Sequence, residues 1–274
     1  MTDSITGVLR KMQVETGPPV SYLIPVGDGF VPLNQNIGKS LRLEFTGNIH
    51  CIGCGRKTSK SFAQGFCYPC FKSLASCDMC IMKPETCHYH LGTCREPEWG
   101  ETHCMQDHIV YLANSSGLKV GITRGTQIPT RWIDQGATQA IPMFRVGNRL
   151  HSGLLEVTIK KQVSDRTDWR KLLKGEADSV DLVALRQQIF NNAEQDLEQL
   201  KQDNPELEWE FLDADPIVLS FPVETYPQKI SSLNFDKNPI VEGVLQGIKG
   251  QYLILDSGVI NIRKFAGYEV TVPI

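Results

Sequence analysis

The pattern of apolar and polar residues changes several times along the 274-residue chain. In residues 1–49, short apolar runs are separated by glycine- and proline-containing turns, and the run LRLEF at 41–45 alternates apolar and charged residues. Alternation with a period of two is typical of a strand with one buried face. We therefore expect an N-terminal β segment over residues 1–49.

A compact α+β unit is predicted for residues 109–176. The runs IVYLAN and LKVGIT are strand-like and are joined by a Ser-Ser-Gly turn, which indicates a hairpin. PTRWIDQGA predicts a short helix, AIPMFRVG a third strand, and HSGLLEVTIKKQV a helix with one apolar stripe. This order predicts a three-stranded sheet with helices packed against it.

Two further segments follow this unit. Residues 177–204 carry leucines at helical spacing and an acidic, amide-rich opposite face, which predicts a long packing or dimerisation helix. After Pro205, alternation and glycine-centred turns indicate a small β domain over residues 205–274. The N-terminal strands are candidates to complete its sheet.

Residues 50–108 have too few aliphatic side chains for a conventional core, so a bound metal must replace it. All nine cysteines lie between Cys51 and Cys104, and an odd number cannot pair off internally. The first residues lack the apolar run of a signal peptide, and no stretch approaches the ~20 apolar residues of a membrane span. We expect a cytoplasmic protein whose cysteines bind metal.

The spacing of the first four cysteines predicts a structural zinc site. Cys51 and Cys54 form one C-x2-C pair, and Cys67 and Cys70 form a second pair twelve residues later. Two such pairs supply four thiolates and close a tetrahedral site with no open position. Iron uses the same ligands, but nothing else in the sequence suggests electron transfer, which favours zinc. The segment is therefore predicted to be a zinc-ribbon-like module.

A second group of cysteines and histidines predicts a second zinc site in the same module. The four ligands that we predict are Cys77, Cys80, Cys94 and Cys104. The alternatives that stay open are Cys87, His88, His90 and His103. One or two structural zinc ions are therefore expected.

Charge is unevenly distributed, although the net charge is only −3. Residues 1–170 contain 19 lysines and arginines against 14 acidic residues, whereas residues 171–274 contain 9 against 17. A basic front half is compatible with DNA or RNA as a partner.

Two tripeptides on the adjacent predicted strands, Ile109-Val110-Tyr111 and Lys119-Val120-Gly121, precede Arg131 on the short helix and Glu156 on the later helix. In this order and spacing, the unit resembles the GIY-YIG nuclease superfamily. Stretches such as GTCREP and KVGITR look like a bacterial branch that combines such a domain with a cysteine-rich zinc-binding segment.

The resemblance implies metal-dependent phosphodiester hydrolysis of DNA or RNA. Glu156 would hold Mg²⁺ or Mn²⁺, and Arg131 would clamp phosphate oxygens. Tyr111 would position or deprotonate the attacking water. Lys119 stands where the superfamily often has a second tyrosine and could bind phosphate, while Gln135, four residues after the arginine, is a poor proton carrier. These departures keep an alternative open: a non-catalytic zinc-containing adaptor that binds nucleic acid or protein.

Overall fold

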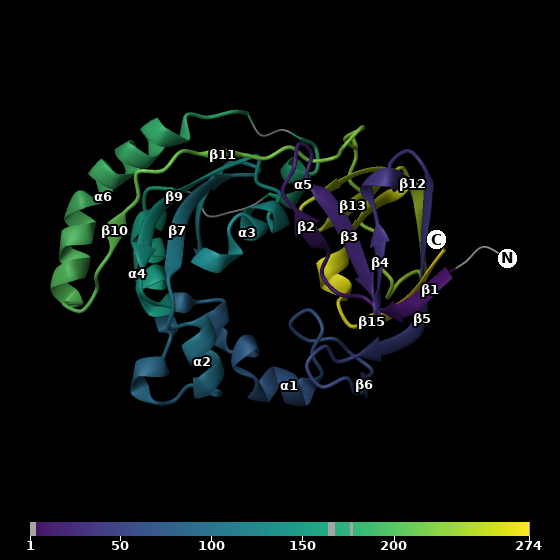
Figure 1. Ribbon diagram of the computed structural model, residues 1–274, viewed down its shortest axis with the longest axis horizontal. Coiled ribbons are helices and arrows are strands. Elements are labelled where there is room, and N and C mark those ends of the chain that lie inside the picture. The colour runs from purple at the N-terminus through teal and green to yellow at the C-terminus, as the bar shows by residue number, and fades with distance from the viewer. Residues whose placement is uncertain (1–3, 164–167, 176–177, 274) are drawn as a thin grey trace.

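The computed structural model describes residues 4–163, 168–175 and 178–273. It is a mixed α/β protein whose named strands pair antiparallel in three sheets. In Figure 1, the strands from the two ends of the chain lie on one side and a second sheet with the long helix lies on the other. The cysteine-rich segment runs beneath both, from β6 to α2.

The first sheet combines both ends of the chain. Its strands, in spatial order, are β1 (Ser4–Val8), β15 (Tyr268–Pro273), β5 (Ser40–His50), β12 (Ile240–Lys249), β13 (Tyr252–Leu255) and β14 (Gly258–Asn261), with β6 (Lys57–Thr58) paired to β5. The alternating run predicted at 41–45 lies in β5, where Leu41 and Leu43 are buried. The N-terminal and C-terminal β segments are therefore joined by hydrogen bonds into one sheet.

A small three-stranded sheet packs into the same core. It consists of β2 (Gln13–Glu15), β3 (Ser21–Val26) and β4 (Gly29–Pro32). Tyr22 and Ile24 of β3 belong to the apolar cluster that contains Leu43 of β5 and Val270 of β15.

The central sheet contains the three predicted strands and two more. Its strands are β8 (Leu118–Arg124), β7 (His108–Asn114), β9 (Gln139–Val146), and the short β10 (Glu210–Phe211) and β11 (Ile217–Val218). The two short strands come from the predicted C-terminal β domain and both pair with β9. The sheet has five strands rather than the expected three, because β9 would otherwise leave an unpaired edge.

Strand β7 lies at the centre of this sheet and is buried on both faces. Side chains alternate between the two faces of a strand. Val110 and Leu112 therefore pack in the core beneath α4 (Arg149–Lys160) and α6 (Leu182–Asp203), whereas Ile109 and Tyr111 pack toward the first sheet. Helix α3 (Thr130–Asp134) lies on the side of Tyr111, and the short α5 (Trp169–Leu172) follows α4.

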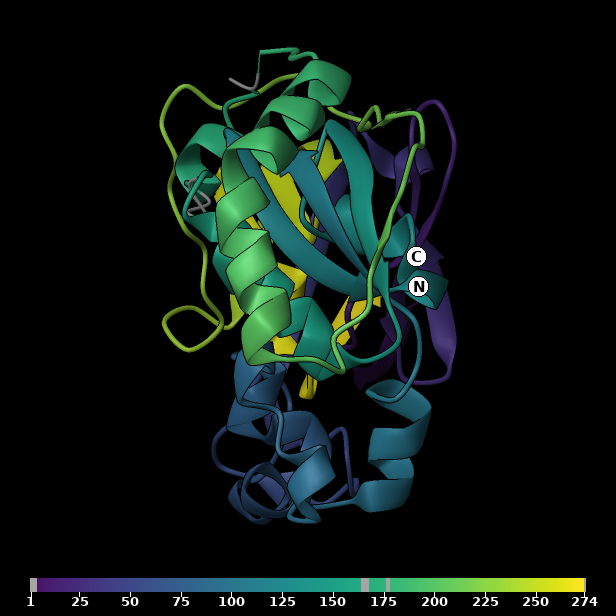
Figure 2. The same cartoon turned by 90° about the vertical axis from the view of Figure 1, so that its left-hand side faces the viewer.

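The long predicted helix is α6, and it has a packing role within the chain. Its side chains Leu182, Ile189, Ala193 and Leu197 are buried in the cluster that also contains Leu155 of α4. Figure 2 shows α6 crossing one face of the central sheet. Asp181 caps its first turn by accepting a hydrogen bond from the backbone N–H of Ala184 (2.9 Å).

None of the helices described is long and apolar enough to cross a membrane.

The cysteine-rich segment contains only short elements. They are α1 (Tyr68–Ser73), α2 (Pro97–His103), and the 3₁₀ turns η2 (Ala75–Cys77), η3 (Met79–Ile81), η4 (Pro84–Thr86) and η5 (Tyr89–Leu91). Turn η4 packs directly on α4. A Cβ added to Gly153 of α4 would lie 2.3 Å from the backbone nitrogen of Glu85, so only glycine permits this approach.

Candidate metal centres and adjoining cleft

The first group of cysteines comes together as predicted. The sulfur atoms of Cys51, Cys54, Cys67 and Cys70 all lie within 4.8 Å of one another, and those of Cys54 and Cys67 are 3.8 Å apart. A tetrahedron with zinc–sulfur bonds of about 2.3 Å has edges of about 3.8 Å, so the spacing fits such an ion. We call this group the first cage.

Local structure explains the first cage. Cys51 follows the end of β5, and the turn that carries Cys54 closes with a hydrogen bond from the N–H of Gly55 to the carbonyl of Cys51 (2.8 Å). Gly55 has a φ of +74°, which favours glycine. Cys67 is the residue before α1, and Cys70 lies in its first turn. Strand end and helix start therefore each contribute one pair of thiols.

The electrostatics of the first cage favour a thiolate. Burial raises the pKa of Cys51, but hydrogen bonds from backbone N–H groups, among them those of Cys67 and Cys54, outweigh it and bring the pKa to about 6. Burial and the neighbouring thiols raise the pKa of Cys70 to about 12. The close spacing of the four sulfur atoms therefore prevents all of them from being thiolates at once. A bound soft cation would stabilise all four as thiolates.

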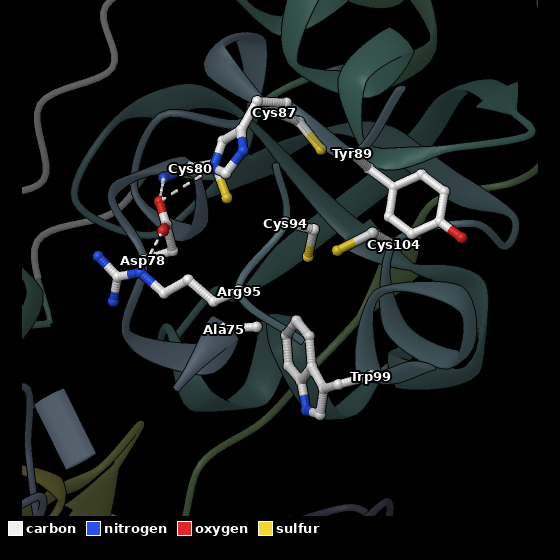
Figure 3. A pocket seen from close by; sticks show the side chains of 10 residues that line it. Ala75, Asp78, Cys80, Cys87, Tyr89, Cys94, Arg95, Trp99 and Cys104 are labelled. Atoms are coloured by element: carbon white, nitrogen blue, oxygen red, sulfur yellow. Dashed lines mark hydrogen bonds and ion pairs between the residues drawn. The ribbon is translucent and has the colours of Figure 1, made fainter. Parts of the chain in front are cut away.

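A second group of four cysteines surrounds a small cavity of about 10 Å³. Figure 3 shows the side chains of Cys80, Cys87, Cys94 and Cys104 around this cavity. The cavity is no larger than a single water molecule or ion requires. We call this group the second cage.

The residues around this cavity differ from the predicted ligand set at one position. Cys77 is not among them, and Cys87, one of the alternatives, is. In a C-x2-C turn that grips one ion, backbone N–H groups point at the first sulfur. Here the N–H of Cys80 is donated to the carboxylate of Asp78 (3.2 Å), and the backbone at Asp78 is extended. Cys77 and Cys80 consequently belong to separate 3₁₀ turns.

The three histidines that were alternatives have other surroundings. His103 stacks on Trp99 with ring centroids 4.1 Å apart, and His90 is exposed. His88 forms with Asp78 and Cys80 a further group whose ligand atoms lie within 4.8 Å of one another. The carboxylate of Asp78 is already paired with Arg95 at 2.6 Å. Among the described residues, the four thiols of the second cage are not all within 4.8 Å of one another, but thiols are the donors that a soft cation prefers.

Next to the second cage lies a large cleft of about 610 Å³ between the central sheet, α3 and α4. Three of the four residues predicted for the active site line it: Lys119 from β8, Arg131 from α3 and Glu156 from α4. The glutamate does not face open water. Its side chain is 13% exposed, it pairs with Lys160 at 3.6 Å, and burial raises its pKa.

The fourth residue, Tyr111, is not among those that line the cleft. Its side chain is fully buried, with its ring at 5.7 Å from that of Trp132, and its hydroxyl donates a hydrogen bond to Gln135 Oε1 (3.0 Å). A Cβ at Gly121 would lie 2.8 Å from that hydroxyl, so the phenol sits directly beneath the strand that forms the cleft wall. Burial raises its pKa, although Arg131 opposes this. The phenol therefore contacts Gln135 and Arg131 beneath the cleft rather than lining it.

Lys119 combines burial with a neighbouring positive charge. The residue is 7% exposed, and burial together with Arg131 lowers its pKa to about 8. Its ammonium group therefore loses its proton more readily than an ordinary lysine, and a bound anion would favour the charged form.

Several charged residues of the cleft were missed by sequence reasoning. They are Lys11, Arg124, Asp134, Arg149 and Arg263. Lys11 forms an ion pair with Asp134, which also accepts a hydrogen bond from Gln251 (2.8 Å). Lys11 and Arg263 are far from the others in the sequence, so no local pattern could have grouped these residues.

The comparison with known families matches residues 38–270 to the family described as "Protein of unknown function (DUF2797)". The chain belongs to this family. Searches of curated proteins and of solved structures give no match.

In this DUF2797 chain, one side chain links the second cage to the cleft. Arg149 is the first residue of α4 and lines the cleft, yet its guanidinium donates hydrogen bonds to the carbonyl oxygens of Cys80 (3.3 Å) and Ile81 (2.7 Å). Ile81, Met82 and Pro84 also line the cleft. The DUF2797 cysteine segment therefore forms one wall of the hollow that contains Glu156.

Proposed function

We propose that the cleft binds a phosphodiester of DNA or RNA and hydrolyses it with the help of a divalent cation, and that both cages hold structural zinc. The observation that carries the proposal is the meeting of an ammonium group, a guanidinium and a carboxylate from three different elements in one hollow. The order of these elements is the one that the GIY-YIG resemblance implies.

Each side chain has a distinct task in this proposal. The planar fork of Arg131 pairs with two phosphate oxygens, and Lys119 binds a third as a point charge. The carboxylate of Glu156 is the oxygen ligand for Mg²⁺ or Mn²⁺. A divalent cation held there would supply Lewis-acid polarisation of the phosphodiester. Tyr111, whose hydroxyl also donates to Gln135, holds the guanidinium in place from beneath.

The two cages are proposed to replace an apolar core in the cysteine-rich segment. Four thiolates around one ion make a closed structural site, and the first cage has the sulfur spacing for it. Zinc in the second cage would fix the turns that carry Ile81, Met82 and Pro84 into the cleft.

Cleavage of labelled branched, flapped and single-stranded DNA and RNA with Mg²⁺ tests the catalytic proposal. We expect Glu156→Gln and Arg131→Ala each to lower the rate by at least about 100-fold, since the first removes the ligand of the divalent cation and the second removes a group that contacts the reacting phosphate. Lys161→Ala is the matched control, because this exposed lysine pairs with Asp196 (2.9 Å) and adjoins α4 without lining the cleft.

A second candidate function is favoured by the burial of Tyr111 and by Gln135 beside it. Without a phenol or an efficient proton carrier in the cleft, the same charges would bind nucleic acid without cutting it. If the zinc-loaded protein binds these substrates and leaves all of them intact, the non-catalytic adaptor replaces the nuclease.

A further inference from the structure

The cleft continues into a second hollow along the cysteine-rich segment. This second hollow has a volume of about 680 Å³, and we call it the module groove. The residues that line both are Lys11, Ile81, Met82, Arg131 and Arg263. Cleft and groove therefore adjoin each other, with Arg131 and Arg263 in the walls of both, and we call the two together the channel.

The two parts of the channel differ in chemistry. The cleft is lined mainly by charged groups, whereas the module groove is lined by apolar side chains: Ile52, Phe66, Phe71, Met79, Ile81 and Met82. Met79 and Met82 are 63% and 79% exposed, which is unusual for apolar side chains beside a large hollow.

The first cage supports the aromatic wall of the module groove. A Cβ added to Gly53, between Cys51 and Cys54, would lie 3.2 Å from the ring of Phe66. Phe71 lies in α1 one residue after Cys70 and stacks on Phe62, with ring centroids 5.7 Å apart and planes inclined by 22°. The two rings that line the groove are thus held by the elements that carry the thiols.

Positive charge exceeds negative charge along the channel wall. Arg10 and Arg263 line the groove, and the acidic groups that approach them are engaged: Asp78 pairs with Arg95, and Asp134 pairs with Lys11. A ligand that is anionic along its length and carries flat apolar groups would match both properties.

We propose that the channel binds a single-stranded segment of DNA or RNA. Its phosphates lie against Arg131 and Arg263, and its bases lie against Phe66, Phe71 and Met82 in the module groove. Bases of a duplex are already stacked and cannot reach such side chains, whereas unpaired bases stack on aromatic rings with little sequence preference. The proposal rests on the proposed function only in placing a phosphodiester in the cleft.

Binding without cleavage tests this substrate class separately from the nuclease proposal. Fluorescence anisotropy of the zinc-loaded protein in Ca²⁺ would compare a labelled oligothymidylate with an abasic oligomer of the same length and charge. We expect the abasic strand to bind at least tenfold more weakly, because a stacked base contributes that much. Equal affinity for the two strands, or tighter binding of a duplex, would overturn the proposal.

Surface variants locate the bases without disturbing the cages. Met82→Glu places a negative charge in the groove on a largely exposed side chain, and we expect a loss of affinity of about tenfold. Met105→Glu is the matched control, since Met105 is also exposed and lines neither hollow. If both substitutions lowered the affinity for the oligomer equally, the bound strand would not lie in the module groove.

Aromatic and charged variants complete the test. Phe71→Leu retains apolar contact but removes the ring, so it should abolish most of the preference over the abasic strand, while Phe30→Leu on an exposed hairpin should not. Arg263→Ala should reduce the slope of log affinity against log salt by about 0.7, the value for one phosphate of a single strand. An unchanged base preference in Phe71→Leu, or an unchanged slope in Arg263→Ala, would contradict the proposal, whether or not the protein cleaves DNA.

Discussion

The two cages of the cysteine-rich segment use the same side chain in different ways. The first cage comes from two C-x2-C pairs at a strand end and a helix start, and its sulfur atoms are closely spaced. The second cage collects single thiols from separate turns and the end of α2, and is tied to the cleft by Arg149. A compact repeat thus predicts a self-contained site, whereas scattered ligands indicate a site that depends on neighbouring structure.

The largest effect is expected at the first cage. Cys51→Ser should remove one zinc ion and destabilise the protein by more than about 4 kcal/mol, because the ion substitutes for a core in this segment. Native mass spectrometry of the metal content and urea unfolding would measure both. Full zinc content in Cys51→Ser would contradict the assignment of the first cage.

A comparison of Cys87→Ser with Cys77→Ser tests the ligand set of the second cage. We expect Cys87→Ser to lose one zinc ion and Cys77→Ser to retain two, because Cys87 lines the cavity of the second cage and Cys77 does not. Loss of the ion should also loosen the carbonyl groups that hold Arg149, so hydrogen exchange should increase at the start of α4. The opposite result would restore the set predicted from the sequence.

The contact between η4 and α4 allows a smaller test of the link between cage and cleft. Gly153→Ala would place a methyl group 2.3 Å from the backbone nitrogen of Glu85 and should cost roughly 1–3 kcal/mol. Thermal unfolding would measure this cost. Gly147→Ala is the control, because no atom lies within 4 Å of its Cβ position, and it should leave stability nearly unchanged.

The smallest effect is expected in the cleft wall, away from both cages. The pKa of Lys119 falls to about 8 in the folded protein, so the unfolded chain binds more protons between about pH 8 and its ordinary value of 10.5. Stability should therefore rise with pH across this window. Lys119→Met should abolish that rise and stabilise the protein by roughly 1 kcal/mol at pH 7, whereas Lys161→Met should keep the rise. Urea unfolding of the wild type and both variants at pH 7 and 9.5 would measure the change in the free energy of unfolding with pH.

The sequence predicts the elements of the central unit well because they depend on local periodicity. The strands β7, β8 and β9 and the helices α3, α4 and α6 lie where alternation and helical spacing place them. The first cage follows from its spacing for the same reason. The two short strands added to β9 have no such pattern, because two residues cannot show a period.

The candidate site was predictable only in part. Lys119, Arg131 and Glu156 meet as their order implies. Tyr111 was expected in the cleft, but it lies on the central strand of a sheet covered on both faces, and the sequence does not show which strand is central. Lys11 and Arg263 reach the cleft only because both ends of the chain fold together.

The pairing of β1 and β5 with β15 has a consequence for the order of assembly. Strand β15 lies between β1 and β5 and follows every other described strand in the chain. Until it inserts, the hydrogen-bonding edges that β1 and β5 present to it stay open, although the cysteine segment and the three main strands of the central sheet have already been synthesised. Pairing of β15 with both strands therefore comes after they have been synthesised, and removal of Tyr268–Pro273 would leave two open strand edges that favour aggregation.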